Sequence, residues 1–105
     1  MSSTVHHISE ELHSAIKLLG DDWTLCIVGS LAKQELRFCE IQRSVDSINP
    51  VTLTDRLKRL EKAGIIQRKE ETLDKLSVVY ELTAKGKAIL PIIAEIETFA
   101  RKFST

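Results

Sequence analysis

The sequence predicts a mainly α-helical fold with one small β-hairpin, and three observations lead to that prediction. Apolar residues recur at helical spacing in several stretches, whereas they alternate in the stretch after Gly64. The composition, 43% hydrophobic and 29% charged, is ordinary for a folded soluble protein. With 105 residues we expect a single domain over residues 1–105, whose modest core would be enlarged by dimerisation.

Two helices are predicted in the N-terminal part. Ser9 is a candidate N-cap for the first, whose apolar residues from Leu12 to Leu19 follow helical spacing until Gly20 ends it. Two aspartates then precede a second helix over residues 23–32, where acidic side chains suit the positive end of the helix dipole. The stretch WTLCIVGSL is apolar on nearly every side, so we expect this helix to be buried at the centre.

Two more helices, joined by a polar turn, are predicted next. The stretch ELRF is long enough only for a strand fragment, residues 39–45 form a short helix, and DSIN is the turn. The following helix, residues 50–63, begins after the N-cap Asn49 and ends before Gly64, which suits a left-handed turn. Three leucines at i, i+4 and i+7 predict a stripe that faces the core: Leu53, Leu57 and Leu60.

A β-hairpin is predicted over residues 65–82, because two β-prone runs flank the polar turn TLDKL. In the second run, Val78, Tyr80 and Leu82 alternate with other residues, and we expect them to face inward. The hairpin therefore follows directly after the helix of residues 50–63.

The last helix is predicted to begin after the cap Thr83 and to reach Phe103. Pro91 lies inside this stretch, so we expect a kink or a break between Gly86 and Pro91. Isoleucine and phenylalanine residues form one broad apolar face, which is long for the terminal helix of so small a domain.

This order of elements (helix, helix, short strand, helix, helix, hairpin, helix) is that of a winged helix-turn-helix domain. Residues 39–63 would be the helix-turn-helix, and residues 65–82 would be the wing. In such a domain the second helix, here about residues 50–63, lies in the major groove of DNA. The hairpin just after it is placed to touch the flanking DNA backbone.

The face of helix 50–63 opposite its leucines is the candidate DNA-contacting surface. Near its N-terminus, Thr52 would hydrogen-bond a base or a phosphate and Val51 would contact a thymine methyl group. Cations further along suit phosphates, while Asp55 would accept from a cytosine amino group or orient a neighbouring cation. With the cations of the hairpin, the candidate contacts are Asn49, Val51, Thr52, Thr54, Asp55, Lys58, Arg59, Lys62, Arg68, Lys69 and Lys75.

The charges leave a second interpretation open. The net charge is zero, although residues 37–70 carry eight basic and five acidic residues, against two basic and five acidic over residues 1–36. The helix face is equally explained as an ordinary solvated surface, and the hairpin cations as charges that keep an edge strand from aggregating. Electrical neutrality also suits a winged-helix module that binds protein instead of DNA, which would have little salt-dependent affinity for any duplex.

Four stretches resemble the HxlR-type regulators, a branch of the MarR-like winged-helix transcription factors: LLGDDWTLCIVGSL, LRFCEIQRSV, INPVTLTDRLKRLEKAGIIQR and VYELTAKGKAILPII. They run from Leu18 to Ile93 in the order and spacing of that family. The resemblance implies a homodimeric, sequence-specific transcriptional regulator that binds pseudo-palindromic double-stranded DNA. It also implies that Arg37 lies near the DNA backbone.

The same resemblance implies that the helices near residues 8–20 and 84–103 form the dimer interface. The long apolar face of the last helix agrees with this independently, because on a monomer such a surface would favour aggregation. The expected interface residues are Leu12, Ile16, Leu19, Ile89, Ile93, Ile96, Phe99 and Phe103.

Cys26 and Cys39 are the only cysteines of the chain. Cys26 lies in the most apolar helix, and we expect it to be a small core residue. Cys39 is a candidate redox sensor, because it begins a helix, where the dipole lowers the pKa of a thiol; a cap-like position explains it as well. A small ligand between the dimer helices and the DNA-binding helices is a further candidate effector, without a polar signature that would identify it.

No pattern in the sequence indicates catalysis or metal binding. The glycines stand too far apart for a phosphate-binding loop. His6, His7 and His13 lack metal-ligand spacing and are expected at the surface. We therefore expect no enzymatic activity, cofactor or metal. Without a signal peptide, a membrane-spanning apolar run or disulfide spacing, the sequence predicts a cytoplasmic protein that does not enter membranes.

Overall fold

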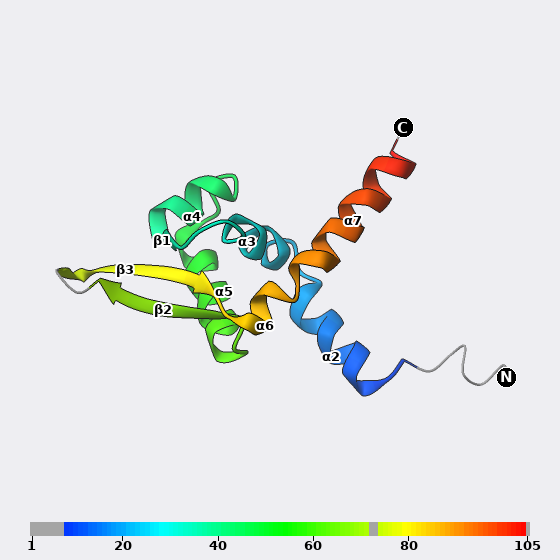
Figure 1. Ribbon diagram of the computed structural model, residues 1–105, viewed down its shortest axis with the longest axis horizontal. Helices are drawn as coiled ribbons and strands as arrows, with labels where there is room; N and C mark the ends of the chain where they lie inside the picture. Colours follow the sequence, from blue (N-terminus) through cyan, green and yellow to red (C-terminus); the bar gives the residue numbers. More distant parts are fainter. Residues whose placement is uncertain (1–7, 72–73, 105) are drawn as a thin grey trace, which may run out of the picture.

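The computed structural model describes residues 8–71 and 74–104, apart from the side chains at 71–77 (Figure 1). Helices and a small antiparallel sheet follow one another in the predicted order. The elements are α2 (Glu10–Leu19), α3 (Thr24–Ser30), β1 (Leu36–Arg37), α4 (Phe38–Ser44), α5 (Pro50–Lys62), β2 (Ile66–Glu71), β3 (Asp74–Leu82), α6 (Ala84–Lys87) and α7 (Leu90–Phe103).

The molecule is elongated, because α2 and α7 project from a body built of α3, α4, α5 and the sheet (Figure 1). Its extents are 59 × 34 × 24 Å, and its radius of gyration is 15.9 Å. A compact domain of this length would have a radius of gyration of about 13 Å. The outer surfaces of α2 and α7 are therefore left uncovered by the rest of the chain.

The core lies under α5. The three leucines of its predicted stripe are all buried, at 2% exposure or less. They belong to one cluster with Ile27 and Val28 of α3, Ile41 of α4 and Ile66 of β2. Helical spacing had predicted this buried face of α5, and the structure confirms it.

Several predicted helix ends are also confirmed. The Ser9 hydroxyl accepts a hydrogen bond from the N–H of Leu12 at 3.0 Å, and α2 ends at Gly20. The break expected before Pro91 is present, since α6 and α7 are separate helices and this proline lies in the first turn of α7. Proline suits that position because a first-turn N–H has no intrahelical partner.

The prediction that the second helix is buried on nearly every side is wrong. α3 is shorter than expected, and it buries only one face, which includes Ile27 and Val28. Cys26 and Gly29 are exposed on the other side. The cysteine is therefore not a core residue, because α3 lies at the edge of the body and not at its centre.

The sheet has the strand order β1–β3–β2, with both pairs antiparallel. The expected inward alternation of the last strand is only partly right: Leu82 is buried, but Val78 and Tyr80 are half-buried, and Val79 between them is 5% exposed. The register explains this, because Arg37 and Lys69 flank Val79 on the two neighbouring strands. Long side chains in such positions cover apolar surface with their methylene stems.

Candidate nucleic-acid interface

A tight turn fixes the N-terminus of α5 against α4. Asp46 and Ser47 both adopt left-handed backbone conformations, with φ of 55° and 56°, which are uncommon for residues other than glycine. Gln42 of α4 holds the turn, because its Nε2 donates to the carbonyl oxygen of Ile48 at 2.8 Å. Its own carbonyl oxygen accepts from the N–H of Ser47 at 3.0 Å. The two helices are therefore held in one geometry.

Asn49 caps α5, as predicted. Its Oδ1 accepts hydrogen bonds from the N–H groups of Val51 at 2.8 Å and Thr52 at 3.3 Å. The amide oxygen is thus used within the helix, where it satisfies N–H groups that have no intrahelical partner. By capping α5, Asn49 helps to fix the position of the other predicted DNA contacts on this helix.

The outer face of α5 consists of five exposed residues: Val51, Thr54, Asp55, Lys58 and Lys62. Val51 is 78% exposed, so almost no part of the chain covers it. Among the described residues, neither Lys58 nor Lys62 has a carboxylate within ion-pair distance. This face therefore presents an apolar side chain near the helix start and uncompensated cations further along.

The flank of α5 that faces α3 carries two arginines paired with two carboxylates. Arg56 Nη1 lies 2.7 Å from Asp55 Oδ2, and Arg56 Nε lies 3.5 Å from Asp21 Oδ1. Arg59 approaches the same carboxylates less closely, at 3.8 Å from Asp55 and 4.0 Å from Asp21. Asp55 thus lies beside Arg59, and it contacts Arg56 more closely.

Asp21 is held at the N-terminus of α3 by three hydrogen bonds. Its Oδ1 accepts from the N–H groups of Trp23 and Thr24, both at 2.8 Å, and its Oδ2 accepts from the Thr24 hydroxyl at 2.6 Å. Partial burial would raise the pKa of Asp21, but these hydrogen bonds, with the charge of Arg56, outweigh it and hold the pKa below its ordinary value. Asp21 is therefore a fixed negative charge beside α5.

Sequence reasoning missed Arg56 as a site residue. Its position falls between the buried stripe and the outer face of α5, so helical spacing does not show what it contacts. Its side chain is 22% exposed, and its partner Asp21 is remote in the sequence. The one available signal was its place within the family-like stretch LTDRLKRL, next to the buried Leu57.

The wing, formed by β2 and β3, presents Arg68 towards α5. This arginine lines a cavity of about 400 Å³ between the sheet and the helices, together with Lys58, Tyr80 and Glu61. Arg68 and Lys58 come from different elements, and they therefore bring two cations of the predicted set to one place.

Lys69 lies on the opposite face of the wing, because successive side chains of a strand alternate. Its Nζ is 2.9 Å from Glu35 and 3.4 Å from Glu81. The hydrogen bond to Glu35, with the charges of both carboxylates, raises the pKa of Lys69 above its ordinary value. The structure thus separates Lys69 from Arg68. The side chain of Lys75 lies outside the described residues.

Two further predicted residues lie at the start of α4. Arg37 is exposed, and its N–H donates to Glu40 Oε1 at 2.8 Å, which satisfies one donor at the helix start. Cys39 follows in the first turn of α4 and is exposed. Both cysteines of the chain, Cys26 and Cys39, are therefore exposed residues.

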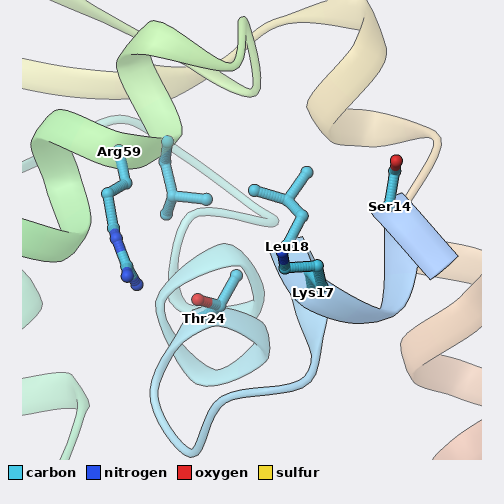
Figure 2. Close-up of a pocket in the computed structure, with 6 residues that line it drawn as sticks. Ser14, Lys17, Leu18, Thr24 and Arg59 are labelled. Atoms are coloured by element: carbon cyan, nitrogen blue, oxygen red, sulfur yellow. The ribbon is translucent and has the colours of Figure 1, made fainter.

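A cavity of about 360 Å³ opens between α2, α3 and α5 (Figure 2). Leu18 and Leu60 supply its apolar part, and two cations, Lys17 and Arg59, reach it from different helices. Its remaining lining residues are the hydroxyl residues Ser14 and Thr24. This cavity lies where the sequence suggested that a small ligand would bind.

The predicted dimer residues fall into two groups. Ile89 is 6% exposed and belongs to the core of the chain itself, because it lies at the α6–α7 break, inside the body. Leu19 and Ile93 are half-buried against that core. The others are exposed by about half or more: Leu12, Ile16, Ile96, Phe99 and Phe103. An apolar groove of about 330 Å³ runs between α2 and α7, with Leu12, Ile16 and Ile96 among its lining residues.

Residues 8–71 and 74–104 contain no cluster of three or more potential metal-binding side chains. None of the helices described there has the length and apolar character needed to cross a membrane. His6 and His7 lie outside the described residues.

Comparisons with known proteins agree with this architecture. A model of the HxlR-like helix-turn-helix family matches residues 18–105. YvaP of Bacillus subtilis, an HTH-type transcriptional regulator, is 34% identical over 89 residues, which cover 85% of this chain and 82% of YvaP. YodB, another HTH-type transcriptional regulator of the same bacterium, is 33% identical over 93 residues, or 89% of this chain and 83% of YodB.

Solved structures show the same relationship. The reduced form of YodB superposes with a TM-score of 0.81 at 31% identity, and the match covers 93% of this chain and 96% of YodB. A chain from Porphyromonas gingivalis W83, assigned to the MarR family of regulators, gives a TM-score of 0.82 at 30% identity and covers 93% and 99%. This chain therefore belongs to the HxlR-like helix-turn-helix family and is a DNA-binding transcriptional regulator.

Proposed function

We propose that this regulator binds double-stranded DNA as a homodimer, with the outer face of α5 in the major groove and the wing on the flanking backbone. The observation that carries the proposal is the difference between the two sides of α5. One side carries three buried leucines, whereas the outer face is exposed to solvent. Its cations, Lys58 and Lys62, have no carboxylate partner among the described residues. A helix so presented fits the width of the major groove.

The residues of α5 divide by position into two roles. Val51, Thr52 and Thr54 lie in its N-terminal half, which reaches base edges in helix-turn-helix proteins. Lys58 and Lys62 follow on the outer face and suit phosphates. Arg59 is a third phosphate contact, 59% exposed but shared with Asp21 and Asp55. The remaining α5 contacts, Asn49 and Asp55, orient these groups.

On the wing, the proposed backbone contacts are Arg68 and Lys75, with Lys69 the weakest of the three. Arg68 shares a cavity with Lys58 of α5, so one phosphate would be held between the two elements. Lys69 would first have to give up its ion pairs with Glu35 and Glu81. Arg37, at the start of α4, supplies a further contact to the backbone.

The homodimer rests on the apolar surface of α2 and α7. Phe99 and Phe103 are 66% and 64% exposed, with ring centroids 5.2 Å apart. They lie further along α7 than Ile96, which lines the groove together with Leu12 and Ile16. Burial of this surface against a second copy would remove it from water and place two recognition helices on one duplex.

Effector control is the remaining part of the proposal. YodB has been solved in reduced, diamide-treated and quinone-bound forms. In this chain we assign the redox role to Cys39, which is exposed on α4, and a small-molecule role to the cavity of Figure 2. Hydrogen peroxide, which oxidises a single thiol to a sulfenic acid and is itself reduced to water, should weaken DNA binding by the wild type and by Cys26→Ser, but not by Cys39→Ser. An unchanged wild type would remove the redox assignment.

Fluorescence anisotropy tests the proposed function directly. The purified protein is titrated against duplexes tiled from the DNA that flanks its own gene, at several salt concentrations. We expect tight, salt-dependent binding to one duplex with two chains per duplex. Thr52→Ala should then change the preferred sequence without a change in the salt slope. Weak, uniform binding to every duplex would instead favour the protein-binding module.

A further inference from the structure

α5 is attached through two polar contacts, at Arg56 and at Ala63, to the segment that follows α2 and to the segment that precedes α7. We propose that these contacts, to Asp21 and to Lys85, fix the position and tilt of α5 relative to α2 and α7. They thereby set the spacing between the two half-sites that the dimer accepts. This inference rests on the proposed function, since it requires a dimer on DNA.

The first contact joins α5 to the α2–α3 corner. Asp21 follows α2 directly and is immobilised by its hydrogen bonds to the first residues of α3. Arg56 Nε lies 3.5 Å from this carboxylate, buried and without a hydrogen-bond partner, so its charge relies on the carboxylates around it. The Arg56 side chain is 22% exposed and its Nη1 pairs with Asp55 of the same helix. The buried Nε is the part that faces Asp21, so α5 is favoured where Arg56 stays close to that carboxylate.

The second contact joins the other end of α5 to the segment before α7. Lys85 of α6 donates from Nζ to the carbonyl oxygen of Ala63 at 2.7 Å. Ala63 is the C-cap of α5, where carbonyl groups lack intrahelical partners and a cation suits the helix dipole. Gly64 then turns the chain with a φ of 78°, which leads it towards the wing.

The surroundings of Lys85 make this contact rigid. The Thr83 hydroxyl lies 2.5 Å from the carbonyl oxygen of Gly64 and accepts from the N–H of Gly86 at 3.1 Å. The N–H of Thr83 donates to the carbonyl oxygen of Ile65 at 3.0 Å. At Gly86 a Cβ atom would lie only 2.1 Å from that same oxygen, so only glycine permits the close approach. The stretch LTAKG thus clamps α6 onto the corner between α5 and β2.

Two contacts at different positions restrain the tilt of a helix more strongly than a single contact. Positions 56 and 63 are separated by about 10 Å along the helix axis at the usual rise per residue. The leucine stripe and the Gln42 turn already hold α5 against the core and α4, and the two polar contacts add restraints on its tilt relative to α2 and α7. In a symmetric dimer, that tilt determines where each recognition helix meets the DNA.

Spacing selectivity is the measurable consequence. One base pair moves a half-site by about 3.4 Å along the DNA and turns it by about 35° around the axis. The probes are duplexes that repeat the half-site of the tightest-binding DNA in inverted orientation, with the native spacer or one base pair more or fewer. The measured quantity is the ratio of affinities for native and altered spacing.

Each contact has a variant and a matched control. Asp21→Asn removes the charge that faces Arg56, and Asp22→Asn makes the same change at the exposed neighbour. Lys85→Met removes the bond to Ala63, and Lys87→Met removes a charge from the same short helix. We expect Asp21→Asn and Lys85→Met each to lower the spacing ratio by about fivefold, and both controls to keep it.

The salt slope and the melting temperature of each variant distinguish a change in the position of α5 from a lost phosphate contact and from a loss of folded protein. Lys85 is not a proposed phosphate contact, so the salt slope should stay unchanged in Lys85→Met. Asp21 lies 4.0 Å from Arg59, a proposed phosphate contact, so for Asp21→Asn only the spacing ratio is compared. A general loss of folded protein would weaken binding to all three spacings by one factor. That result, or an unchanged ratio, would overturn the inference while the proposed function stands. A wild type that binds no duplex, or binds as a monomer, would overturn both.

Discussion

α5 and α7 are similar helices with opposite environments. They contain 13 and 14 residues, and each has an apolar stripe along one side. The stripe of α5 is buried, since Leu53, Leu57 and Leu60 are exposed by 2% or less. No residue of α7 is buried, and Phe99 is 66% exposed. Helical spacing therefore shows which face is apolar, but not what covers that face.

The difference follows from where the two helices lie. α5 is surrounded by α3, α4 and the sheet, while α7 leaves the body beside α2 (Figure 1). The apolar stripe of α5 thus stabilises the fold, and that of α7 is available for a second copy. The two stripes should therefore respond differently to substitution.

Leu57→Ala should lower the free energy of unfolding by about 2–5 kcal/mol, because it creates a cavity beneath a fully packed helix. Phe103→Ala removes a larger side chain from α7 and should change the stability of the monomer by less than about 0.5 kcal/mol. Urea denaturation at low protein concentration measures both. Equal losses would mean that the α7 stripe contributes to the core after all.

Ile96→Glu should raise the dimer dissociation constant by about a hundredfold, because a carboxylate would be buried in an apolar interface. Thr98→Glu adds the same charge to the same helix away from the stripe and serves as the control. Analytical ultracentrifugation measures the dissociation constant of each, and circular dichroism verifies the helix content. A dimer that survives Ile96→Glu would show that the proposed interface is elsewhere.

The ends of a helix could be predicted from the sequence more accurately than the faces that it buries. The ends of α5 were predictable because their signals are local: Asn49 precedes the helix and Gly64 follows it. The burial of α3 was not predictable in this way. Cys26 is exposed because α3 lies at the edge of the body. Apolar content alone does not reveal which neighbours a helix has.

In the candidate site, likewise, the sequence does not show which partners a charged residue contacts. Arg68 and Lys69 are adjacent cations, yet one shares a cavity with α5 and the other is paired with Glu35 and Glu81. Which of them faces α5 depends on the strand register, and no local pattern of charges encodes it. Arg56 was overlooked for a related reason, because its partner Asp21 belongs to another element.

The outer face of α5 differs from the α7 stripe in presenting cations, and a smaller effect is expected there. Lys62→Ala should weaken DNA binding for every sequence and lower the salt slope by about 0.9, the value for one lost phosphate contact. Lys69→Ala removes the same charge from the paired side of the wing and should lower the slope by less, because Lys69 must first give up its ion pairs with Glu35 and Glu81. Anisotropy titrations at several salt concentrations measure both slopes. If the two variants lowered the slope equally, the ion pairs of Lys69 would not persist on DNA.

The smallest expected effect concerns the carboxylate beside α5. Asp21→Asn should lower the free energy of unfolding by about 1 kcal/mol at neutral pH, because the charged hydrogen bonds and the contact with Arg56 are weakened. The pKa of Asp21 is below its ordinary value in the folded chain, so the unfolded chain binds the proton more readily. The stabilisation is therefore complete above about pH 4 and is lost as the pH falls through the lowered pKa.

Urea denaturation of the wild type and Asp21→Asn from pH 7 to pH 3 tests this dependence. The difference in the free energy of unfolding should stay constant down to about pH 4 and then shrink, because protonation turns the wild-type carboxylate into a neutral group like the amide. Asp22→Asn, one residue along, makes the same change and serves as the control, because the exposed Asp22 carboxylate has no ion-pair or hydrogen-bond partner among the described residues. A difference that grew towards acidic pH would require a raised pKa. Burial would then outweigh the hydrogen bonds that Asp21 accepts at the start of α3.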